Sequence, residues 1–355
     1  MMLKRKSLLI KTVPFILLGL LAFALYLIFF VNIGEMVAKI RQTSLPIYLL
    51  SIVATVVEMV FFAFAWQFFL IPLSAEISFK KAFMYSWVSN FIDLLIPAES
   101  ISGEIVRVYL ITRDGVDTGK AAASAVTQRI FSMVIVIGAL TTGALYFSIF
   151  QIPFPSLIQS LIFLALVVGV FFLSIILILC FKENWTQKLI DKLIVLVERI
   201  SRKRWNLDAW RDRARKGTRV FYESLRAFSS NPRKLILPVG LSILSWFFGV
   251  LVYYLVFAAM GYILDWIILI IVYSLVVALK SVPIGVPAEV GMTEIAMTVL
   301  FGAFSVPSPI SAAATILIRI VTVWFRFIIG FGAVQWVGVK VLLGNATPIG
   351  QKDEK

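Results

Sequence analysis

Long apolar runs, separated by short polar links, dominate the hydropathy pattern of this chain. An α-helix needs about 20 mainly apolar residues to cross the hydrocarbon core of a bilayer. Six runs have a length in this range and predict full spans: residues 13–31, 46–70, 122–150, 157–181, 235–260 and 309–342. The pattern therefore predicts an all-α polytopic membrane protein with about six full spans.

Two further apolar stretches, residues 82–111 and 266–304, are interrupted near their middle by Pro, Gly and Glu. Proline stops a helix, and glycine permits a sharp turn. Each stretch is therefore predicted to form two short helices. Whether these broken hairpins are re-entrant or cross the membrane completely is left open by the sequence.

Positively charged residues predict which compartment each link faces, because Lys and Arg are retained on the cytoplasmic side of a membrane. Basic residues flank the first interrupted stretch at both ends, and the segment 182–234 carries 15 Lys or Arg against 6 Asp or Glu. Both regions are predicted to be cytoplasmic, and the second stretch then starts and ends outside. We expect a multi-pass protein of the cytoplasmic membrane with both termini inside, and an external loop containing Lys39 and Arg41.

The chain repeats itself after 190 positions, most visibly in "PAESISGE" (97–104) and "PAEVGMTE" (287–294). Eleven residues of the first unit meet identical ones without a gap: Pro97, Ala98, Glu99, Glu104, Ile105, Leu110, Val116, Ala122, Ala123, Arg129 and Ile130. The repeated unit is span, broken hairpin, span. One span, 157–181, separates the copies, so the second copy is predicted to be inserted upside down, as an inverted-topology repeat.

This repeat divides the chain into five parts. They are an N-terminal transmembrane helix and loop (1–45), the first repeat (46–150), a linking span with a basic cytoplasmic segment (151–234), the second, inverted repeat (235–345) and a C-terminal tail (346–355). Within the basic segment, residues 185–200 show a helical apolar stripe, which fits either a helix on the inner leaflet or an ordinary cytoplasmic loop.

The broken hairpins contain most of the candidate site residues, because charged side chains and non-helical backbone at membrane depth need protein partners or a wet cavity. A second half-helix is expected to begin near Ser102 or Met292, where free N–H groups favour an anion. The candidate transport or substrate-binding residues are Glu99, Ser102, Gly103, Glu104, Arg107, Arg129, Pro283, Gly285, Pro287, Glu289, Gly291, Glu294, Arg319 and Arg326. Asp93 and Lys280 are further intramembrane candidates.

Several of these residues admit a purely structural interpretation. Glu104 and Glu294 lie in a first helical turn, where a carboxylate can serve as a cap. The spacing of Glu104 and Arg107 allows an ion pair within one helix. Arg129 and Arg319 either extend to the interface or hold a phosphate or a hairpin carboxylate. Glu58, inside the second span, is either a proton-handling group or the buried partner of an arginine.

Composition excludes some classes of function. Hydrophobic residues make up 61% of the chain and charged residues 15%, so a soluble domain is excluded, and the net charge of +14 points to membrane orientation and anionic lipid rather than nucleic acid. The chain has no histidine, which weakens hydrolase, transferase and metalloenzyme interpretations. The single cysteine, Cys180, lies in an apolar run. We expect no enzyme activity, no metal and no cofactor.

The hairpin residues resemble the signatures of a known family. Pro97, Gly103, Glu104 and Arg107 are similar to the first signature of the lysylphosphatidylglycerol synthase transmembrane, or flippase-like, family, and Pro283, Gly285, Pro287, Gly291 and Glu294 are similar to its second. The resemblance implies an integral inner-membrane protein. Some members of the family form the flippase half of the multiple peptide resistance factor, which moves aminoacylated phospholipid. Since no soluble domain follows the last span, aminoacyl transfer is expected to be absent.

The sequence thus predicts a lipid flippase or transporter that moves a headgroup through a central cavity between two inverted hairpins. The expected partners are membrane lipids, whether phospholipid, aminoacylated or polyprenyl-linked; nucleic acid is not expected, and a homodimer is left open. The alternatives are a membrane-embedded enzyme acting on a lipid phosphate and a non-transporting partner in cell-envelope assembly.

Overall fold

A computed structural model describes residue 21 and residues 23–96, 101–152, 155–200, 208–280 and 286–343, and this part of the chain is helical without strands. The helices are α2 (Ile33–Arg41), α3 (Leu45–Leu70), α4 (Phe79–Leu95), α5 (Ile101–Arg113), α6 (Thr118–Ile149), α7 (Ser156–Phe181), α8 (Glu183–Ile200), α9 (Asp208–Ser230), α10 (Ile236–Ala259), α11 (Trp266–Lys280), α12 (Met292–Ala303), α13 (Ser308–Arg319) and α14 (Arg326–Leu343). The all-α prediction is confirmed.

Five helices in the described part are long and apolar enough to cross a membrane. They are Leu45–Leu73, Thr118–Ile149, Ser156–Phe181, Pro232–Ala259 and Ser308–Gly338. These bounds agree with five of the predicted spans to within a few residues. Residues 13–20 and 22 of the remaining predicted span, 13–31, lie outside the described residues, which show its end as a helix at Phe23–Phe30.

The segment with Lys39 and Arg41 is a helix, so the prediction of a loop there was wrong. The chain turns by 103° after Phe30 and continues as α2. The Asn32 side chain starts this helix by accepting a hydrogen bond from the Glu35 backbone N–H at 3.3 Å. Met36 is the buried residue of α2 and packs with Ala312 and Ala313 at the start of α13. A short amphipathic helix against a neighbouring helix explains why this segment lacks the apolar length of a span.

Each interrupted stretch forms two short helices, as predicted, and the same turn follows both pairs. After α5, the N–H groups of Asp114, Gly115 and Val116 donate to the carbonyls of Ile111, Thr112 and Ile111. After α12, the N–H groups of Phe304, Ser305 and Val306 donate to the carbonyls of Phe301, Gly302 and Phe301. All three bonds are related by the shift of 190 positions. Gly115 and Ser305, which also match, both have positive φ, at 96° and 64°. The repeat therefore extends to backbone conformation.

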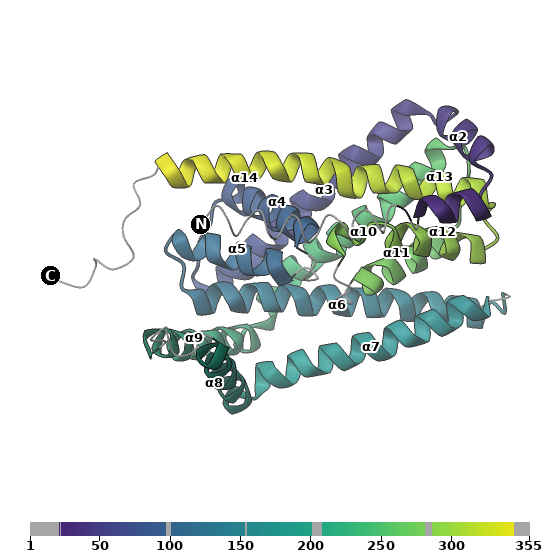
Figure 1. Ribbon diagram of the computed structural model, residues 1–355. Helices are drawn as coiled ribbons and strands as arrows, with labels where there is room; N and C mark the ends of the chain where they lie inside the picture. The colour runs from purple at the N-terminus through teal and green to yellow at the C-terminus, as the bar shows by residue number, and fades with distance from the viewer. Residues whose placement is uncertain are drawn as a thin grey trace.

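The two units contact each other in matched pairs. Helix α14 of the second unit packs against α4 of the first hairpin, and α6 of the first unit packs against α11 of the second hairpin. Helices α3 and α10, which are equivalent in the repeat, pack along each other. Figure 1 shows α4 and α5 toward one end of the bundle and α11 and α12 toward the other. Helices α6 and α14 thus each bury a face against the hairpin of the other unit.

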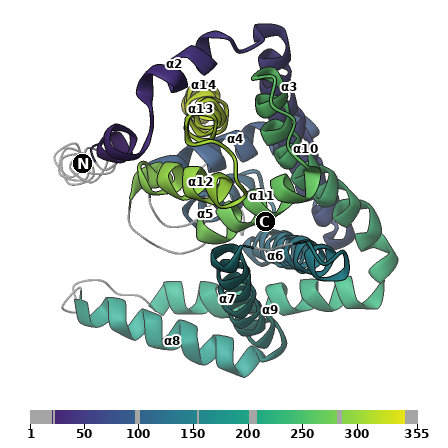
Figure 2. The same ribbon diagram turned by 90° about the vertical axis from the view of Figure 1, so that its right-hand side faces the viewer.

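The basic segment folds into two helices beside the bundle. Figures 1 and 2 show α8 and α9 on one side, next to α6 and α7. Helix α8 confirms the helix predicted at 185–200, whereas α9 was not predicted. The Tyr222 hydroxyl of α9 donates to the Leu179 carbonyl near the end of α7, and this hydrogen bond fixes α9 against α7. Whether these helices lie on a membrane surface stays a prediction.

The last predicted span is not a regular α-helix. Residues Ile320–Phe325 form a π-helical segment between α13 and α14. Such segments widen a helix locally and occur often at functional sites. Here the π segment lies between Arg319 and Arg326, which are two of the four arginines among the candidate site residues.

We predict that Gly330 is needed for the contact of α14 with α4. A Cβ at this position would lie 2.6 Å from Phe91 Cβ and 3.1 Å from the Trp87 carbonyl oxygen, so Gly330→Ala should lower the free energy of unfolding by about 1–3 kcal/mol through overpacking. Gly332→Ala on the same helix, where a Cβ meets nothing within 4 Å, is the matched control and should be neutral or slightly stabilising. Thermal unfolding of the purified protein in detergent measures both, and equal melting temperatures would contradict the close contact.

Candidate functional site

A polar cavity lies in the first unit, between α3, α4, α5, α6 and the start of α14. Its volume is about 190 Å³. Its lining residues are Glu58, Met59, Phe62, Ser86, Ser89, Asn90, Asp93, Glu104, Arg107, Gln128, Arg129, Ser132 and Arg326. Three carboxylates and three guanidinium groups therefore face one cavity within an apolar helical bundle.

Helix α4 contributes a polar stripe to this cavity. Ser86, Ser89, Asn90 and Asp93 follow one another at spacings of three, one and three residues, which places them on one face of a helix. Asp93 Oδ1 accepts hydrogen bonds from the Ser102 hydroxyl at 2.7 Å and from the Gly103 backbone N–H at 2.6 Å. Asp93 is thus the cap of α5.

Gly103 is required by this close approach of α5 to α4. A Cβ at position 103 would overlap the Asp93 carboxylate and the Ser89 carbonyl oxygen. The expectation that a half-helix begins near Ser102 is confirmed, since α5 starts at Ile101. One of its N-terminal N–H groups, that of Gly103, donates to Asp93 and is therefore not free to bind an external anion.

Arg107 does not form the ion pair with Glu104 that the spacing allowed. Its side chain is buried, with 1% of the residue exposed, and its Nη1 donates to Gln128 Oε1 at 3.0 Å. The guanidinium carbon lies 4.6 Å from the Trp66 ring centroid and 5.1 Å from that of Phe62. An amide and two aromatic faces stabilise this cation in place of a carboxylate.

Glu104 and Arg129 line the cavity without a partner of their own. Within the described part of the chain, neither side chain makes a hydrogen bond or an ion pair. Buried polar atoms beside them are also unsatisfied among these residues: Asn90 Oδ1, Arg107 Nε and Arg326 Nε. Buried polar groups normally have a hydrogen-bond partner, so this concentration marks a place for water or a ligand.

Glu58 and Arg326 join the two units at the cavity wall. Arg326 Nη2 lies 2.5 Å from Glu58 Oε2, and the two side chains are 15% and 14% exposed. Glu58 is therefore the buried partner of an arginine, which is one of the two roles that the sequence left open. Glu58 lies on α3 of the first unit and Arg326 begins α14 of the second, so the pair crosses the interface between the units.

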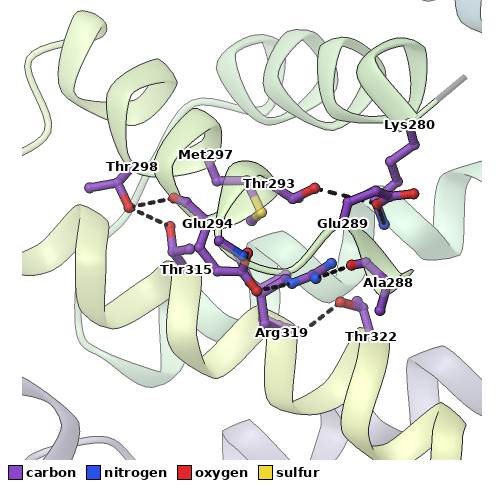
Figure 3. Close-up of polar contacts among 12 residues, drawn as sticks. Lys280, Ala288, Glu289, Thr293, Glu294, Met297, Thr298, Thr315, Arg319 and Thr322 are labelled. Atoms are coloured by element: carbon purple, nitrogen blue, oxygen red, sulfur yellow. Dashed lines mark hydrogen bonds and ion pairs between the residues drawn. The ribbon is translucent and has the colours of Figure 1, made fainter. Parts of the chain in front are cut away.

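The second unit holds its matching acid and base in a direct contact, shown in Figure 3. Arg319 Nε donates to Glu294 Oε1 at 2.7 Å, and Arg319 Nη2 donates to the Ala288 carbonyl at 2.5 Å. The other oxygen of Glu294 accepts from the Gly291 N–H at 2.7 Å and caps α12. The capping role considered for Glu294 is thus observed, whereas Glu104 makes no capping hydrogen bond to any residue that the structure describes.

The backbone of the second break supports this contact. Residues Pro287–Glu289 form a 3-10 turn in which Ala288 and Glu289 have φ values of +50° and +49°. Non-glycine residues adopt this region rarely, and such strain is concentrated at functional sites. Glu289 Oε2 lies 3.7 Å from Lys280 Nζ and accepts from the Thr293 hydroxyl at 3.4 Å.

The structure therefore collects the predicted residues into two groups. The first group lines the cavity and consists of Glu104, Arg107, Arg129 and Arg326; Ser102 and Gly103 donate hydrogen bonds to Asp93 in the cavity wall. The second group lies at the second break and consists of Glu289, Gly291, Glu294 and Arg319. Pro287 opens the 3-10 turn of that break. Glu99, Pro283 and Gly285 lie outside the described residues.

Sequence reasoning missed the polar residues that complete the cavity. The stripe from Ser86 to Asp93 was detectable, because polar residues at helical spacing in an apolar stretch predict a polar face. Gln128 and Ser132 flank Arg129 and share its region of α6. The aromatic partners of Arg107, Phe62 and Trp66, carried no such signal, since their contact depends on the packing of α3 against α5 and α6.

The fold and these groups define a polytopic all-α membrane protein with charged clusters inside its bundle. The sequence model of the family "Lysylphosphatidylglycerol synthase TM region" matches residues 16–330. The chain therefore belongs to this family, as its hairpin residues suggested.

Relatives of similar length occur in archaea. The chain is 24% identical over 335 residues to a UPF0104 membrane protein of Methanothermobacter thermautotrophicus, covering 92% of this chain and 95% of the relative. It is 23% identical to a UPF0104 membrane protein of Methanocaldococcus jannaschii, with 87% and 90% covered. It is 21% identical to one of Pyrococcus horikoshii, with 86% and 91% covered. The match thus extends over nearly the whole length of each chain.

We predict that the buried pair of Glu294 and Arg319 is required for stability. Only 7% of Glu294 and 4% of Arg319 is exposed, and removing one partner of a buried pair costs about 3–5 kcal/mol, so Arg319→Ala should strongly lower the melting temperature. Arg219→Ala is the control, because Arg219 pairs with Glu223 at 3.0 Å with side chains 80% and 55% exposed, and such pairs contribute about 0–1 kcal/mol. Similar melting temperatures for the two variants would show that the buried pair contributes little.

Proposed function

We propose that this protein moves a phospholipid or a related lipid across the cytoplasmic membrane, with the headgroup passing through the cavity of the first unit. The observation that carries this proposal is the unpaired acid and base, Glu104 and Arg129, in a cavity inside a bundle of membrane-spanning length. Ionisable residues at membrane depth are costly, and they mark substrate or ion pathways when they face a cavity.

A lipid fits this arrangement because its two parts have opposite requirements. The charged headgroup needs the polar cavity, while the acyl chains can stay in the surrounding hydrocarbon. The family is named after lysylphosphatidylglycerol synthase, and lysylphosphatidylglycerol is a phospholipid with an aminoacylated headgroup. This name supports a lipid rather than a small soluble solute as the transported molecule. We propose transport without chemical change of the lipid.

Two halves that face opposite ways would supply the transport movement. The shift of 190 residues, the matched turns after both hairpins and the exchanged helix contacts support an inverted-topology repeat with re-entrant hairpins. In transporters with this architecture, one repeat rocks against the other around a site near the midplane. In any one conformation, the two halves of such a transporter are expected to differ from each other. The closed pair in the second unit and the open cavity in the first are a difference of this kind.

The orientation follows from charge. The ends of the first hairpin and the segment with α8 and α9 are basic, and Figure 1 places them toward the same end of the bundle. Under the positive-inside rule we propose that this end faces the cytoplasm.

Translocation is expected to depend on the unpaired acid and base. In vesicles that contain the purified protein and tail-labelled phospholipids, Glu104→Gln and Arg129→Gln should each slow the initial rate by about tenfold or more, because each removes a charge-assisted interaction of roughly 1.5–3 kcal/mol. Glu76→Gln and Arg113→Gln change exposed residues of the same charge and should leave the rate unchanged. Wild-type rates in both cavity variants, with intact folding, would refute the proposal. A new lipid product formed by the purified protein would favour an enzyme instead.

The closed pair of the second unit should control access to the cavity of the first. Replacing Cys180 with Ser and Ser132 with Cys places one thiol in the cavity wall. Adding Glu294→Gln weakens the conformation seen here, so the rate at which a small water-soluble reagent labels this thiol should fall several-fold. Glu223→Gln, which alters an exposed pair, should leave the labelling rate as it was. An unchanged labelling rate in the Glu294→Gln variant would show that the two units do not move together.

A further inference from the structure

The same acid and base are arranged differently in the two units. Glu104 and Arg129 are separated by 25 positions, as are Glu294 and Arg319, and the shift of 190 residues superposes one pair on the other. The second pair is closed, at 2.7 Å. The first pair makes no direct ion pair and faces the cavity. The same acid and base are therefore in direct contact in one unit and separate in the other.

The sequence explains why the first pair stays open. In the second unit, Glu294 caps α12 and is held toward Arg319. In the first unit, Asp93 accepts the hydrogen bonds of the Ser102 hydroxyl and the Gly103 N–H at the start of α5, and Glu104 makes no capping bond among the described residues. The residue that matches Asp93 is Pro283, which has no carboxylate. The first unit thus has an additional acid, Asp93, at the start of α5, and its Glu104 faces the cavity.

The other charges of the cavity have partners within the protein. Glu58 pairs with Arg326, and Arg107 is held by Gln128 and two aromatic rings. Asp93 is bonded to the start of α5. Within the described part of the chain, one carboxylate and one guanidinium group of the cavity, those of Glu104 and Arg129, remain for a ligand. The cavity therefore offers one negative and one positive group in the same small volume.

We infer that Glu104 and Arg129 select a zwitterionic lipid headgroup that carries both a phosphate and an amine. This inference rests on the proposed function and names the substrate class for it. The phosphate binds Arg129, whose planar guanidinium donates two parallel hydrogen bonds, and the ammonium group binds Glu104. The headgroup thus takes the place of the direct contact that closes the second unit.

This arrangement discriminates against headgroups with a single sign of charge. An anionic headgroup without an amine would place its negative charge near the Glu104 carboxylate with no compensation. A cationic headgroup without a phosphate would leave Arg129 unpaired inside the bundle. An uncompensated charge in a low-dielectric site carries a large penalty, so both classes should be transported slowly.

The test compares three lipids with the same labelled acyl chains in vesicles that contain the full chain. They are phosphatidylethanolamine, its N-acetyl derivative, which keeps the phosphate but loses the ammonium charge, and a cationic amine lipid without phosphate. Phosphatidylethanolamine should move about tenfold faster than the other two, a difference of ~1.4 kcal/mol.

The variants separate the roles of the two residues. Glu104→Gln should slow phosphatidylethanolamine and should not slow its N-acetyl derivative, which loses the repulsion by the carboxylate, so the two lipids should then move at similar rates. Arg129→Gln should slow both phosphate lipids. The exposed control Glu76→Gln should preserve the ratio between the lipids. A merely structural role of Glu104 would slow all lipids together, and that result would overturn the inference.

A binding measurement distinguishes failure of this inference from failure of the transport proposal. The thiol of Ser132→Cys, in the Cys180→Ser background, should be protected from labelling by phosphatidylethanolamine and not by its N-acetyl derivative, and Glu104→Gln should remove the difference. Protection without translocation would keep the headgroup assignment and refute transport. Translocation that depends on the cavity but treats the three lipids alike would keep transport and refute the assignment.

Discussion

A charged side chain inside an apolar bundle is tolerated only when a partner, a helix end or water compensates it, and the structure is organised around this constraint. Arg319 pairs with Glu294, Arg326 with Glu58, and Arg107 with an amide and two aromatic rings. These contacts link hairpins to long helices and one unit to the other. The exception among the described residues that line the cavity is the pair Glu104 and Arg129, and that exception marks the candidate site.

The two units share a backbone plan and differ in their polar chemistry. The matched turns and the exchanged contacts of α4 with α14 and of α6 with α11 show how one folding unit was used twice. Asp93 and Arg107 of the first unit correspond to Pro283 and Met297 of the second. These differences in side chains accompany a closed acid–base pair in the second unit and an open one in the first.

Much of the fold could be predicted, because membrane spans depend on apolar length and the repeat on identical residues. The site could be predicted only in part. Glu294, Arg319 and Glu104 were found from their place in the repeat. The ion pair that the spacing allowed between Glu104 and Arg107 does not form, because Arg107 contacts Gln128 and Trp66 on neighbouring helices, which spacing along one helix cannot show. The helix at Ile33–Arg41 was missed because it is short and amphipathic.

The sequence by itself determined that the chain is an all-α membrane protein, where its long helices lie, that its hairpins are broken, and that an acid and a base recur in both units. These features depend on local composition and on spacing along the chain. Only the tertiary structure decided that Glu58 pairs with Arg326, that Asp93 rather than Glu104 caps α5, and that one pair is closed while the other faces a cavity. Such choices depend on which helices pack together, and the energies of charged groups change with every neighbour that packing brings within a few ångströms.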